Sequence, residues 1–522
     1  METLLSDSEN YYDNHRRGNR SHAVRYSKVR VSDLEDESDE IDGDLEGVSL
    51  IRREAGNDLE DDYKGKTFTV QEAIDSLGLG PFQLKLFVIC GLFTAADAME
   101  MMLLAVLSPV LRCEWQLEKY QVALITTVVF IGMGITAPIW GAMGDKFGRR
   151  TTLYMVSLWI GYFGLLTTFS PSYIWILILR SLVGGGLAGS PQSFAILTEY
   201  LPSKHRAKLL NLTQISWAMG TSFEIIVAAI VLPSLGWRWL LFISAIPSFI
   251  ICIVMKFLPE SARYLVAAGR REEAIKVLEK AARTNSATIP EGRLVCSSPV
   301  TQQGKMSDLF SPMYRKTTLQ LWVLWFVTAF SYYGMVLASA EILQVHNAKN
   351  EGGENCSCNL LEYDDYITMI ISTIGEFICL PVNMILFDII GRRKTGAIDL
   401  TGCAVFFILL QINMPQHLLT GIMLLVRGFS AANFNFVYIY TAEVYPTTVR
   451  TLGIGTASAW ARVGAMLTPF VAQVLLDQSL SAAVWVYGSL GLIAAICSWT
   501  LPIETKSRVL PQSVKLEEEE ES

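Results

Sequence analysis

Charged side chains lie inside stretches of this sequence that are otherwise apolar enough to cross a membrane. Asp97 and Glu100 lie near the middle of one stretch, and Glu224 and Glu376 lie in two others. Residues three apart share a face of a helix, and an ion buried in hydrocarbon costs on the order of 3 kcal/mol. A proton or a cationic group can neutralise such a carboxylate. We therefore interpret these four residues as candidates for binding a proton or a cation, with Asp97 first because it lies mid-stretch.

Three arginines lie in further apolar stretches and offer the opposite charge. Arg180 and Arg427 could pair with the buried acids or hold an anionic solute. The alternative is a set of interhelical ion pairs that only fix helix packing, and for Arg462 we prefer this alternative. The four acids favour an organic cation as solute, whereas the three arginines keep an organic anion open. The sequence leaves the sign of the solute undecided.

Amide and aromatic side chains in the same stretches could shape a cavity for a small solute. The alternative for tyrosine and tryptophan near the end of a span is an anchor at the membrane interface. These cavity candidates are Gln192, Gln214, Trp217, Tyr332, Tyr333, Asn433, Asn435 and Tyr438.

The apolar stretches dominate the composition of the chain. It has 522 residues, of which 51% are hydrophobic and 18% are charged, whereas about a quarter of a soluble protein is charged. Blocks of about 20 apolar residues match a hydrocarbon core of roughly 30 Å. The hydropathy predicts an all-α membrane protein with twelve transmembrane helices. We place them at about 84–107, 120–143, 151–170, 173–197, 209–232, 238–258, 319–340, 366–387, 396–412, 418–441, 451–475 and 482–501.

Basic residues in short loops predict the orientation. Arg149 and Arg150 follow the second span, and Arg392 and Arg393 follow the eighth. Basic loops of this kind stay in the cytosol, and an even number of spans puts both termini on one side. The first 60 residues lack the apolar core of a cleavable signal peptide. We therefore expect both termini to be cytosolic.

Five segments divide the chain. Residues 1–66 carry 18 acidic and 10 basic residues, which predicts a disordered cytosolic tail that could bind cytosolic partners. Residues 67–258 and 319–501 each form a six-helix bundle, 259–318 form a cytosolic central loop, and 502–522 form a second cytosolic tail. Short amphipathic helices are predicted at 69–80, where we expect contact with the membrane surface, and at 271–283.

The two bundles repeat each other's loop motifs. Three motifs recur at an offset of 243 or 244 positions, which predicts a duplicated six-helix unit with a cavity between its halves. The pairs are Asp145, Gly148 and Arg149 with Asp388, Gly391 and Arg392; Glu199 and Arg206 with Glu443 and Arg450; and Pro259 with Pro502.

Several functional classes lack support in this sequence. It shows no nucleophile–base pair, no metal-ligand spacing and no phosphate loop, which argues against an enzyme, a cofactor and an ATP-driven pump. The glycine run at 184–186 lies within a span, where helix packing explains it better. No basic face indicates a nucleic-acid partner.

Asn355 begins a glycosylation sequon in the one long external loop. A disulfide of Cys113 with Cys356 or Cys358 is possible, but pairing cannot be read from sequence.

The motifs resemble a known family. GAMGDKFGRR at 141–150 is similar to the loop motif of the major facilitator superfamily, and GWRW at 236–239, PESAR at 259–263 and PIETK at 502–506 resemble its sugar and organic-ion porter branch. The resemblance covers residues 67–506. It implies twelve helices in two six-helix pseudo-repeats and alternating access to a central cavity.

The resemblance implies a gating role for the motif residues. In the family, the acid at Asp145 faces the N-terminal end of span 11 and stabilises the outward-open state, while Gly141 and Gly144 let span 2 approach a neighbour closely. The second copy has Met384 in place of Gly141. The alternative is that the basic residues only hold the loops in the cytosol. The gating candidates are Gly141, Gly144, Asp145, Gly148, Arg149, Arg150, Glu199, Arg206, Glu260, Arg263, Asp388, Gly391, Arg392, Arg393, Glu443, Arg450 and Glu504.

Further stretches, such as AADAMEMMLLAVLSP and EVYPTTVRTLGIGT, resemble a group of orphan transporter-like proteins of neuronal vesicles. Sugar porters carry paired glutamines in span 7, whereas this chain reads AFSYYGM there, which argues against a hexose. We expect a secondary active transporter of a small organic ion, coupled to protons, in the membrane of synaptic or other cytoplasmic vesicles. The alternative is a non-transporting receptor or interaction protein on the same scaffold.

Overall fold

A computed structural model of the chain describes residues 66–295, 305–350, 361–446 and 448–506. Helices that run antiparallel to their neighbours along the chain make up most of this part. Ten of them are long and apolar enough to cross a membrane. Helices α5 and α14, each of which begins with two arginines, complete a set of twelve within the described residues. Every predicted span overlaps one of these helices.

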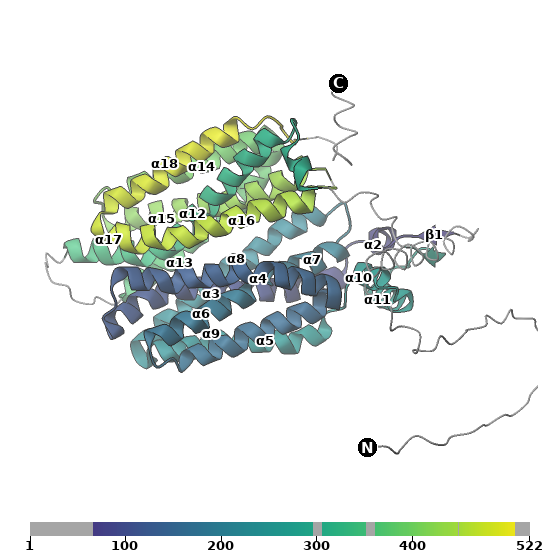
Figure 1. Ribbon diagram of the computed structural model, residues 1–522, viewed down its shortest axis with the longest axis horizontal. Coiled ribbons are helices and arrows are strands. Elements are labelled where there is room, and N and C mark those ends of the chain that lie inside the picture. Colours follow the sequence, from purple (N-terminus) through teal and green to yellow (C-terminus); the bar gives the residue numbers. More distant parts are fainter. Residues whose placement is uncertain (1–65, 296–304, 351–360, 447, 507–522) are drawn as a thin grey trace, which may run out of the picture. The chain divides into compact units, whose positions relative to one another are not determined.

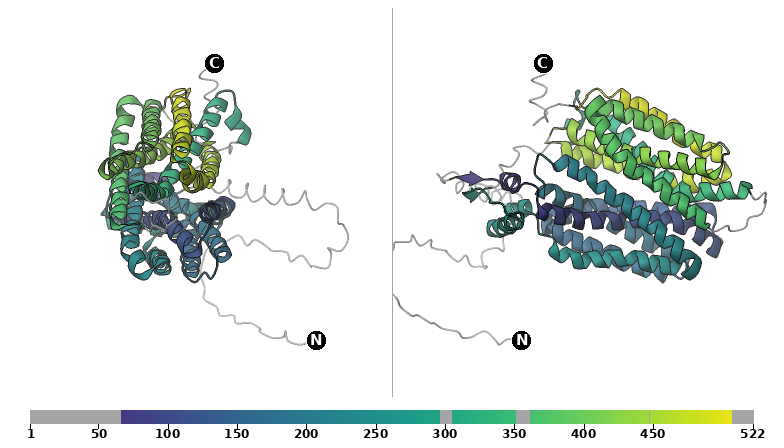
Figure 2. Two further views of the ribbon diagram at one scale, coloured as in Figure 1. Left: turned by 90° about the vertical axis from the view of Figure 1, so that its left-hand side faces the viewer. Right: turned by 180° about the vertical axis from the view of Figure 1, so that it is seen from behind.

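The first six spans are α3 (Pro81–Trp115), α4 (Lys119–Phe147), α5 (Arg149–Thr168), the consecutive α6 (Tyr173–Leu187) and α7 (Pro191–Tyr200), α8 (Arg206–Leu235) and α9 (Trp237–Val254). The last six are α12 (Arg315–Asn350), α13 (Tyr363–Ile390), α14 (Arg392–Leu409), α15 (Gln416–Val444), α16 (Arg450–Pro469) continued by the π-helical η4 (Phe470–Leu475) and α17 (Leu476–Gln478), and α18 (Leu480–Trp499). We call these sets the N-half and the C-half. Figures 1 and 2 show each half as a group of helices lying side by side.

Glycines let the helices of each half cross in close contact. A Cβ atom at Gly132 of α4 would lie 2.0 Å from the carbonyl oxygen of Ser181 on α6, and one at Gly375 of α13 would lie 2.1 Å from that of Leu424 on α15. Gly184, in the glycine run of α6, approaches the α4 backbone in the same way. Only glycine permits such an approach. Gly132 and Gly375 are 243 positions apart, so the repeat extends from the loop motifs to the helix packing.

Short elements gather at one end of the helices. They are β1 (Thr67–Phe68), α2 (Val70–Leu77), η2 (Met255–Phe257), α10 (Ala262–Ala267), α11 (Arg271–Asn285), β2 (Arg293–Leu294) and η3 (Met306–Phe310). Strands β1 and β2 pair in parallel, with Thr67 opposite Arg293. We call this end, which holds the loops at Gly148 and Gly391, the motif end, and the end that holds Arg112 and Asp477 the opposite end.

Helix α2 packs against protein rather than on the membrane surface, where the sequence placed it. Its apolar residues Val70, Ala73, Ile74 and Leu77 are buried, and α2 lies against α11. Asn285 at the end of α11 accepts a hydrogen bond from the Phe82 N–H. The predicted membrane-facing side of α2 is therefore covered by the central loop.

Some predictions concern residues that the structure does not describe. The acidic tail, apart from Lys66, falls in this class, as do Asn355, Cys356, Cys358 and most of the C-terminal tail.

Candidate functional site

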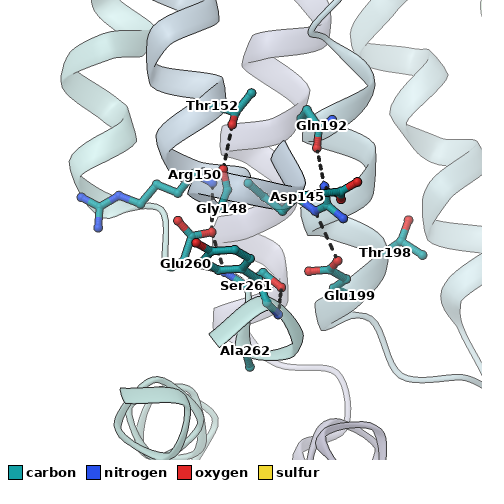
Figure 3. A network of polar contacts seen from close by, with 12 residues as sticks. Asp145, Gly148, Arg150, Thr152, Gln192, Thr198, Glu199, Glu260, Ser261 and Ala262 are labelled. Atoms are coloured by element: carbon teal, nitrogen blue, oxygen red, sulfur yellow. Dashed lines mark hydrogen bonds and ion pairs between the residues drawn. The ribbon is translucent and has the colours of Figure 1, made fainter. Parts of the chain in front are cut away.

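The first copy of the loop motif forms a compact network at the motif end. Gly148 has φ of +95° and precedes α5. The Glu260 carboxylate accepts hydrogen bonds from the backbone N–H groups of Arg150 at 3.1 Å and Ser261 at 3.0 Å, as Figure 3 shows. A Cβ atom on residue 148 would lie 2.5 Å from Glu260. Gly148 therefore supplies both the left-handed backbone and the space that lets a carboxylate cap the N-terminus of α5.

The second copy repeats this geometry. Gly391 has φ of +91° and precedes α14. The Glu504 carboxylate accepts hydrogen bonds from the backbone N–H groups of Arg392 at 2.9 Å and Arg393 at 3.2 Å. Each half therefore ties its last motif to the start of its third span.

The two halves also repeat an arginine–glutamate pair, but not with equal strength. Arg392 binds Glu443 through two hydrogen bonds of 3.0 Å each. Its counterpart Arg149 lies 3.8 Å from Glu199, bonds to Asp145 at 2.7 Å and donates to Gln192 at 3.3 Å. A bidentate pair is the stronger arrangement.

Further basic motif residues bind nearby backbone and amide oxygens. Arg206 donates to the carbonyl oxygen of Leu201 at 3.1 Å, and Arg450 donates to that of Tyr445 at 3.4 Å. The side-chain oxygen of Gln71, on α2, accepts hydrogen bonds from both Arg206 and Arg263.

A second contact joins α2 to the loop before α8. Asp75 accepts hydrogen bonds from the backbone N–H of Ser203 at 2.7 Å and from its hydroxyl at 3.0 Å. Partial burial acts to raise the pKa of Asp75, but these bonds, with a further one from Gln71, outweigh it and hold the pKa below its usual value. Hydrogen bonds of the Gln71 and Asp75 side chains therefore attach helix α2 to the N-half.

Two gating candidates, Asp145 and Gly141, lie differently from what the resemblance implies. The Asp145 side chain is 72% exposed and pairs with Arg149 of its own half, not with span 11. A Cβ atom at Gly141 would meet no atom within 4 Å, whereas one at Gly144 would lie 2.6 Å from Gln192. Close approach is therefore built at Gly144 and not at Gly141. Asp388, the counterpart of Asp145, is exposed.

Two of the buried acids form ion pairs with two of the buried arginines. Arg180 donates to Glu100 at 2.8 Å, with both side chains at most 3% exposed. Arg427 donates to Glu376 at 2.7 Å, with both at most 2% exposed. Each pair joins two helices of one half, so the structure favours the packing interpretation for these four residues.

Three further buried acids interact with uncharged polar side chains. The Glu224 carboxylate accepts a hydrogen bond from Ser244 at 2.8 Å, and its second oxygen accepts no hydrogen bond from the described residues. Asp97 is 7% exposed and interacts with the Ser190 side chain. Asp399, on α14, is 3% exposed and interacts with Asn383. Sequence reasoning missed Asp399, although it lies inside a predicted span and the same charge criterion would have found it.

A chain of aromatic and polar contacts joins the two halves midway along the helices. The Trp217 indole N–H on α8 donates to the Tyr332 hydroxyl on α12. That hydroxyl donates to Glu376 at 3.2 Å. The ring of Phe130, on α4, lies 4.9 Å from the ring of Tyr333. Three of the predicted cavity residues therefore lie at the interface between the halves.

The other predicted cavity residues fall in different places. Gln192 lies at the motif end beside Arg149. Asn433 and Asn435 are buried and, within the described part of the chain, have side-chain atoms without hydrogen-bond partners, whereas Tyr438 is 47% exposed. Gln214 is half-buried on α8.

At the opposite end, ion pairs cross from one half to the other. Arg112 of α3 lies 4.0 Å from both Glu341 of α12 and Asp477 of α17, and Lys119 of α4 pairs with Asp477. Nothing in the sequence shows that these distant residues meet.

Two surface pockets lie near the two ends of the helices. One of about 390 Å³ is next to Lys85 and Phe257, and one of about 380 Å³ is next to Arg112 and Lys119. Neither is lined by a buried acid, so a solute cavity between the halves stays a prediction.

Comparison with known proteins decides the family. The family model described as "Sugar (and other) transporter" matches residues 84–514. This chain belongs to that transporter family.

Relatives of this family member match most of its length. SVOPL from Homo sapiens is 45% identical over 463 residues, covering 86% of this chain and 94% of that protein. The synaptic vesicle 2-related protein of Xenopus laevis is 43% identical over 498 residues, covering 93% and 89%. The predicted resemblance is confirmed.

Solved structures confirm the predicted fold of this transporter-family chain. The inward open conformation of the xylose transporter XylE from E. coli superposes with a TM-score of 0.64 at 15% identity, covering 82% of this chain and 98% of that one. A partially occluded inward open conformation of the same protein gives 0.65 at 17% identity. The chain is a multi-pass membrane protein with the major facilitator fold, and the roles of its individual residues stay predictions.

Proposed function

We propose that this chain is a secondary active transporter that moves a small organic ion by alternating access, driven by a proton gradient across a vesicle membrane. One observation carries the proposal. The ion pairs of the opposite end join the two halves, whereas Arg149 and Arg392 at the motif end pair within their own halves.

Such an asymmetry is what one state of an alternating-access cycle requires. At the opposite end, ion pairs hold the two halves together. At the motif end, each half pairs its own charges, so the halves can separate there without leaving buried charges unpaired. The exposed Asp145 is free to take a new partner when the motif end closes. The arrangement corresponds to a state that opens towards the cytosol, if the arginine-rich loops are cytosolic as the positive-inside rule predicts.

Asp97 is the carboxylate best suited to proton coupling. Glu100 and Glu376 are already neutralised by Arg180 and Arg427. Asp97 lies mid-helix on α3, is 7% exposed and forms no ion pair among the described residues. A change of its protonation therefore alters the charge that the interface must bury.

The names of several relatives, which are synaptic vesicle 2-related proteins, support a location in vesicles. In an acidified vesicle, a proton gradient is available as a driving force. Both termini would face the cytosol.

Proteoliposomes with an imposed pH gradient test the proposal. Accumulation of organic cations, anions and zwitterions is measured for the wild type, for Asp97→Asn and for Glu118→Gln, which changes an exposed acid at the opposite end. Asp97→Asn should insert normally and lose gradient-driven accumulation, and Glu118→Gln should keep it.

Two outcomes count against the proposal. Unchanged proton-driven flux in Asp97→Asn removes Asp97 from the mechanism. No accumulation by the wild type across the whole panel supports the alternative of a non-transporting receptor or interaction protein.

A further inference from the structure

One of the two surface pockets lies where α3 begins and α9 ends. It has a volume of about 390 Å³, and its lining includes Leu84 and Val88 of α3, Val254 of α9 and Phe257 of η2. Leu84 and Phe257 are 64% and 63% exposed, so the pocket is open to the surroundings of the chain. All its lining residues belong to the N-half, and the pocket therefore does not lie between the halves.

The pocket combines an apolar wall with one charged side chain. Within the described part of the chain, Lys85 is the one charged residue of its lining. The Lys85 Nζ atom lies 5.0 Å from the centre of the Phe257 ring, and the face of an aromatic ring attracts a cation at this distance. A lysine can lay its apolar stem along such a wall while its ammonium group stays in a polar layer. The contact with Phe257 thus keeps an ammonium group beside the pocket.

A second ammonium group comes from the residue next to Phe257. Lys256 and Lys85 are both exposed, and neither forms an ion pair among the residues that the structure describes. The lining that is described contains no acidic side chain. Two basic side chains without an acidic partner therefore accompany an apolar pocket.

The sequence places this pocket at the edge of the hydrocarbon core. The first predicted span begins at Leu84 and the sixth ends at Leu258, and both of these ends lie at the motif end. The positive-inside rule predicts that the motif end, with its arginine-rich loops, faces the cytosol. The cytosolic leaflet carries the anionic lipids of a membrane, and basic pockets between helices on this side bind their head groups.

We propose that this pocket binds one phospholipid of the cytosolic leaflet whose head group carries a net negative charge. Part of an acyl chain packs on Leu84, Val88, Val254 and Phe257, while the Lys85 and Lys256 ammonium groups bind the anionic head group. A free phosphate would leave the apolar wall uncovered, and a lipid without net charge would leave the two lysines without a counter-charge. The proposal does not depend on the transport function.

Three probes separate the two parts of the lipid. They are dioleoyl phosphatidylserine, dioleoyl phosphatidylcholine, which has the same chains but no net charge, and glycerophosphoserine, which has the anionic head group but no chains. Native mass spectrometry of the purified full-length chain, titrated with each probe, measures the dissociation constant of the first molecule bound. Phosphatidylserine should bind at least about fivefold more tightly than phosphatidylcholine, the ratio expected for one lysine at a membrane surface. Glycerophosphoserine should bind more weakly than either lipid.

Charge variants assign the head group. Lys85→Gln should weaken binding of phosphatidylserine by about fivefold, and Lys85→Gln combined with Lys256→Gln should remove its advantage over phosphatidylcholine. Lys85→Arg keeps the charge and should keep the advantage. Lys394→Gln, which removes an exposed lysine of α14 at the same end of the molecule, is the matched control and should bind as the wild type does.

A size variant assigns the acyl chain. Val88→Trp fills the pocket without changing charge and should weaken binding of both lipids. Val382→Trp on α13 is its control, because Val382 is 49% exposed and Val88 is 51% exposed, but Val382 does not line the pocket. Melting temperatures of all variants should stay close to that of the wild type, since every changed side chain is exposed.

Four outcomes would overturn the proposal. Equal binding of the two lipids removes the charge contact. An equal loss in Lys394→Gln and Lys85→Gln shows only diffuse attraction to the basic end of the molecule. Binding of glycerophosphoserine as tight as that of phosphatidylserine indicates an anion site that does not hold a lipid chain. Unchanged lipid binding in Val88→Trp shows that no chain enters the pocket.

Discussion

The Arg427 guanidinium donates a hydrogen bond from its Nε atom to the Glu376 carboxylate at 2.7 Å. Both side chains are at most 2% exposed. The same carboxylate accepts a hydrogen bond from Tyr332 at 3.2 Å, and another nitrogen of Arg427 lies 4.0 Å from the sulfur of Met102 in the N-half. The pair therefore holds α13 to α15 and also borders the other half.

Removing one partner of this pair should destabilise the chain strongly. Glu376→Gln leaves the Arg427 charge buried without compensation, at a cost of about 3–5 kcal/mol. The double variant Glu376→Gln with Arg427→Gln removes both charges and should recover a large part of the loss. Melting temperatures in detergent are compared for the wild type, Glu376→Gln and the double variant, with Asp364→Asn, which changes an exposed acid on α13, as the control. A double variant as unstable as Glu376→Gln alone would contradict a pairing role.

The glycine crossings give a prediction that does not depend on charge. Gly375→Ala would place a methyl group 2.1 Å from the Leu424 carbonyl oxygen, and the helices would have to separate at a cost of about 1–3 kcal/mol or more. Gly421→Ala, on α15, is the control, because a Cβ atom there would meet nothing within 4 Å.

The two glycine variants should have different effects on the melting temperature and on the yield of folded protein. Gly375→Ala should lower the melting temperature and the yield of folded protein. Gly421→Ala should leave both unchanged or slightly raised, since alanine favours a helix over glycine by about 1 kcal/mol. Equal behaviour of the two variants would show that α13 and α15 do not cross at Gly375.

Features with a period or a repeat could be predicted from the sequence, whereas contacts between distant segments could not. The twelve spans followed from hydropathy, and the offset between Asp145 and Asp388 predicted the duplication. The sequence did not show that Gln192, a predicted cavity residue, instead bonds to Arg149 at the motif end. It also did not show that Arg112 lies near Asp477. Such partners depend on how helices far apart in the chain pack, and no local pattern records that.

The repeated arginine–glutamate pairs should differ in strength. Arg392 and Glu443 share two hydrogen bonds of 3.0 Å. One oxygen of Glu199, by contrast, lies 3.8 Å from Arg149, and the other accepts no hydrogen bond within the part of the chain that the structure describes. Glu443→Gln should therefore cost about 1.5–3 kcal/mol, the range for hydrogen bonds to charged groups, and Glu199→Gln less. Melting temperatures of the two variants, which change equivalent positions of the repeat, measure the difference. A larger loss in Glu199→Gln would reverse the order and contradict the geometry.

The ion pairs of the opposite end should control which side of the transporter is open. Asp477 pairs with Lys119 and lies 4.0 Å from Arg112, and it is the residue through which α17 holds both α3 and α4. Asp477→Lys places a third positive charge beside these two bases, so the halves should separate there and the open-outside state should gain population. A cysteine introduced at Val474, which borders the adjacent pocket, should then react faster with a membrane-impermeant maleimide. Combining Asp477→Lys with Lys119→Asp restores one opposite-charge pair and should slow the reaction again, whereas Glu118→Gln should leave it unchanged. A reaction rate that ignores the charge exchange would mean that apolar packing alone, and not these pairs, closes this end.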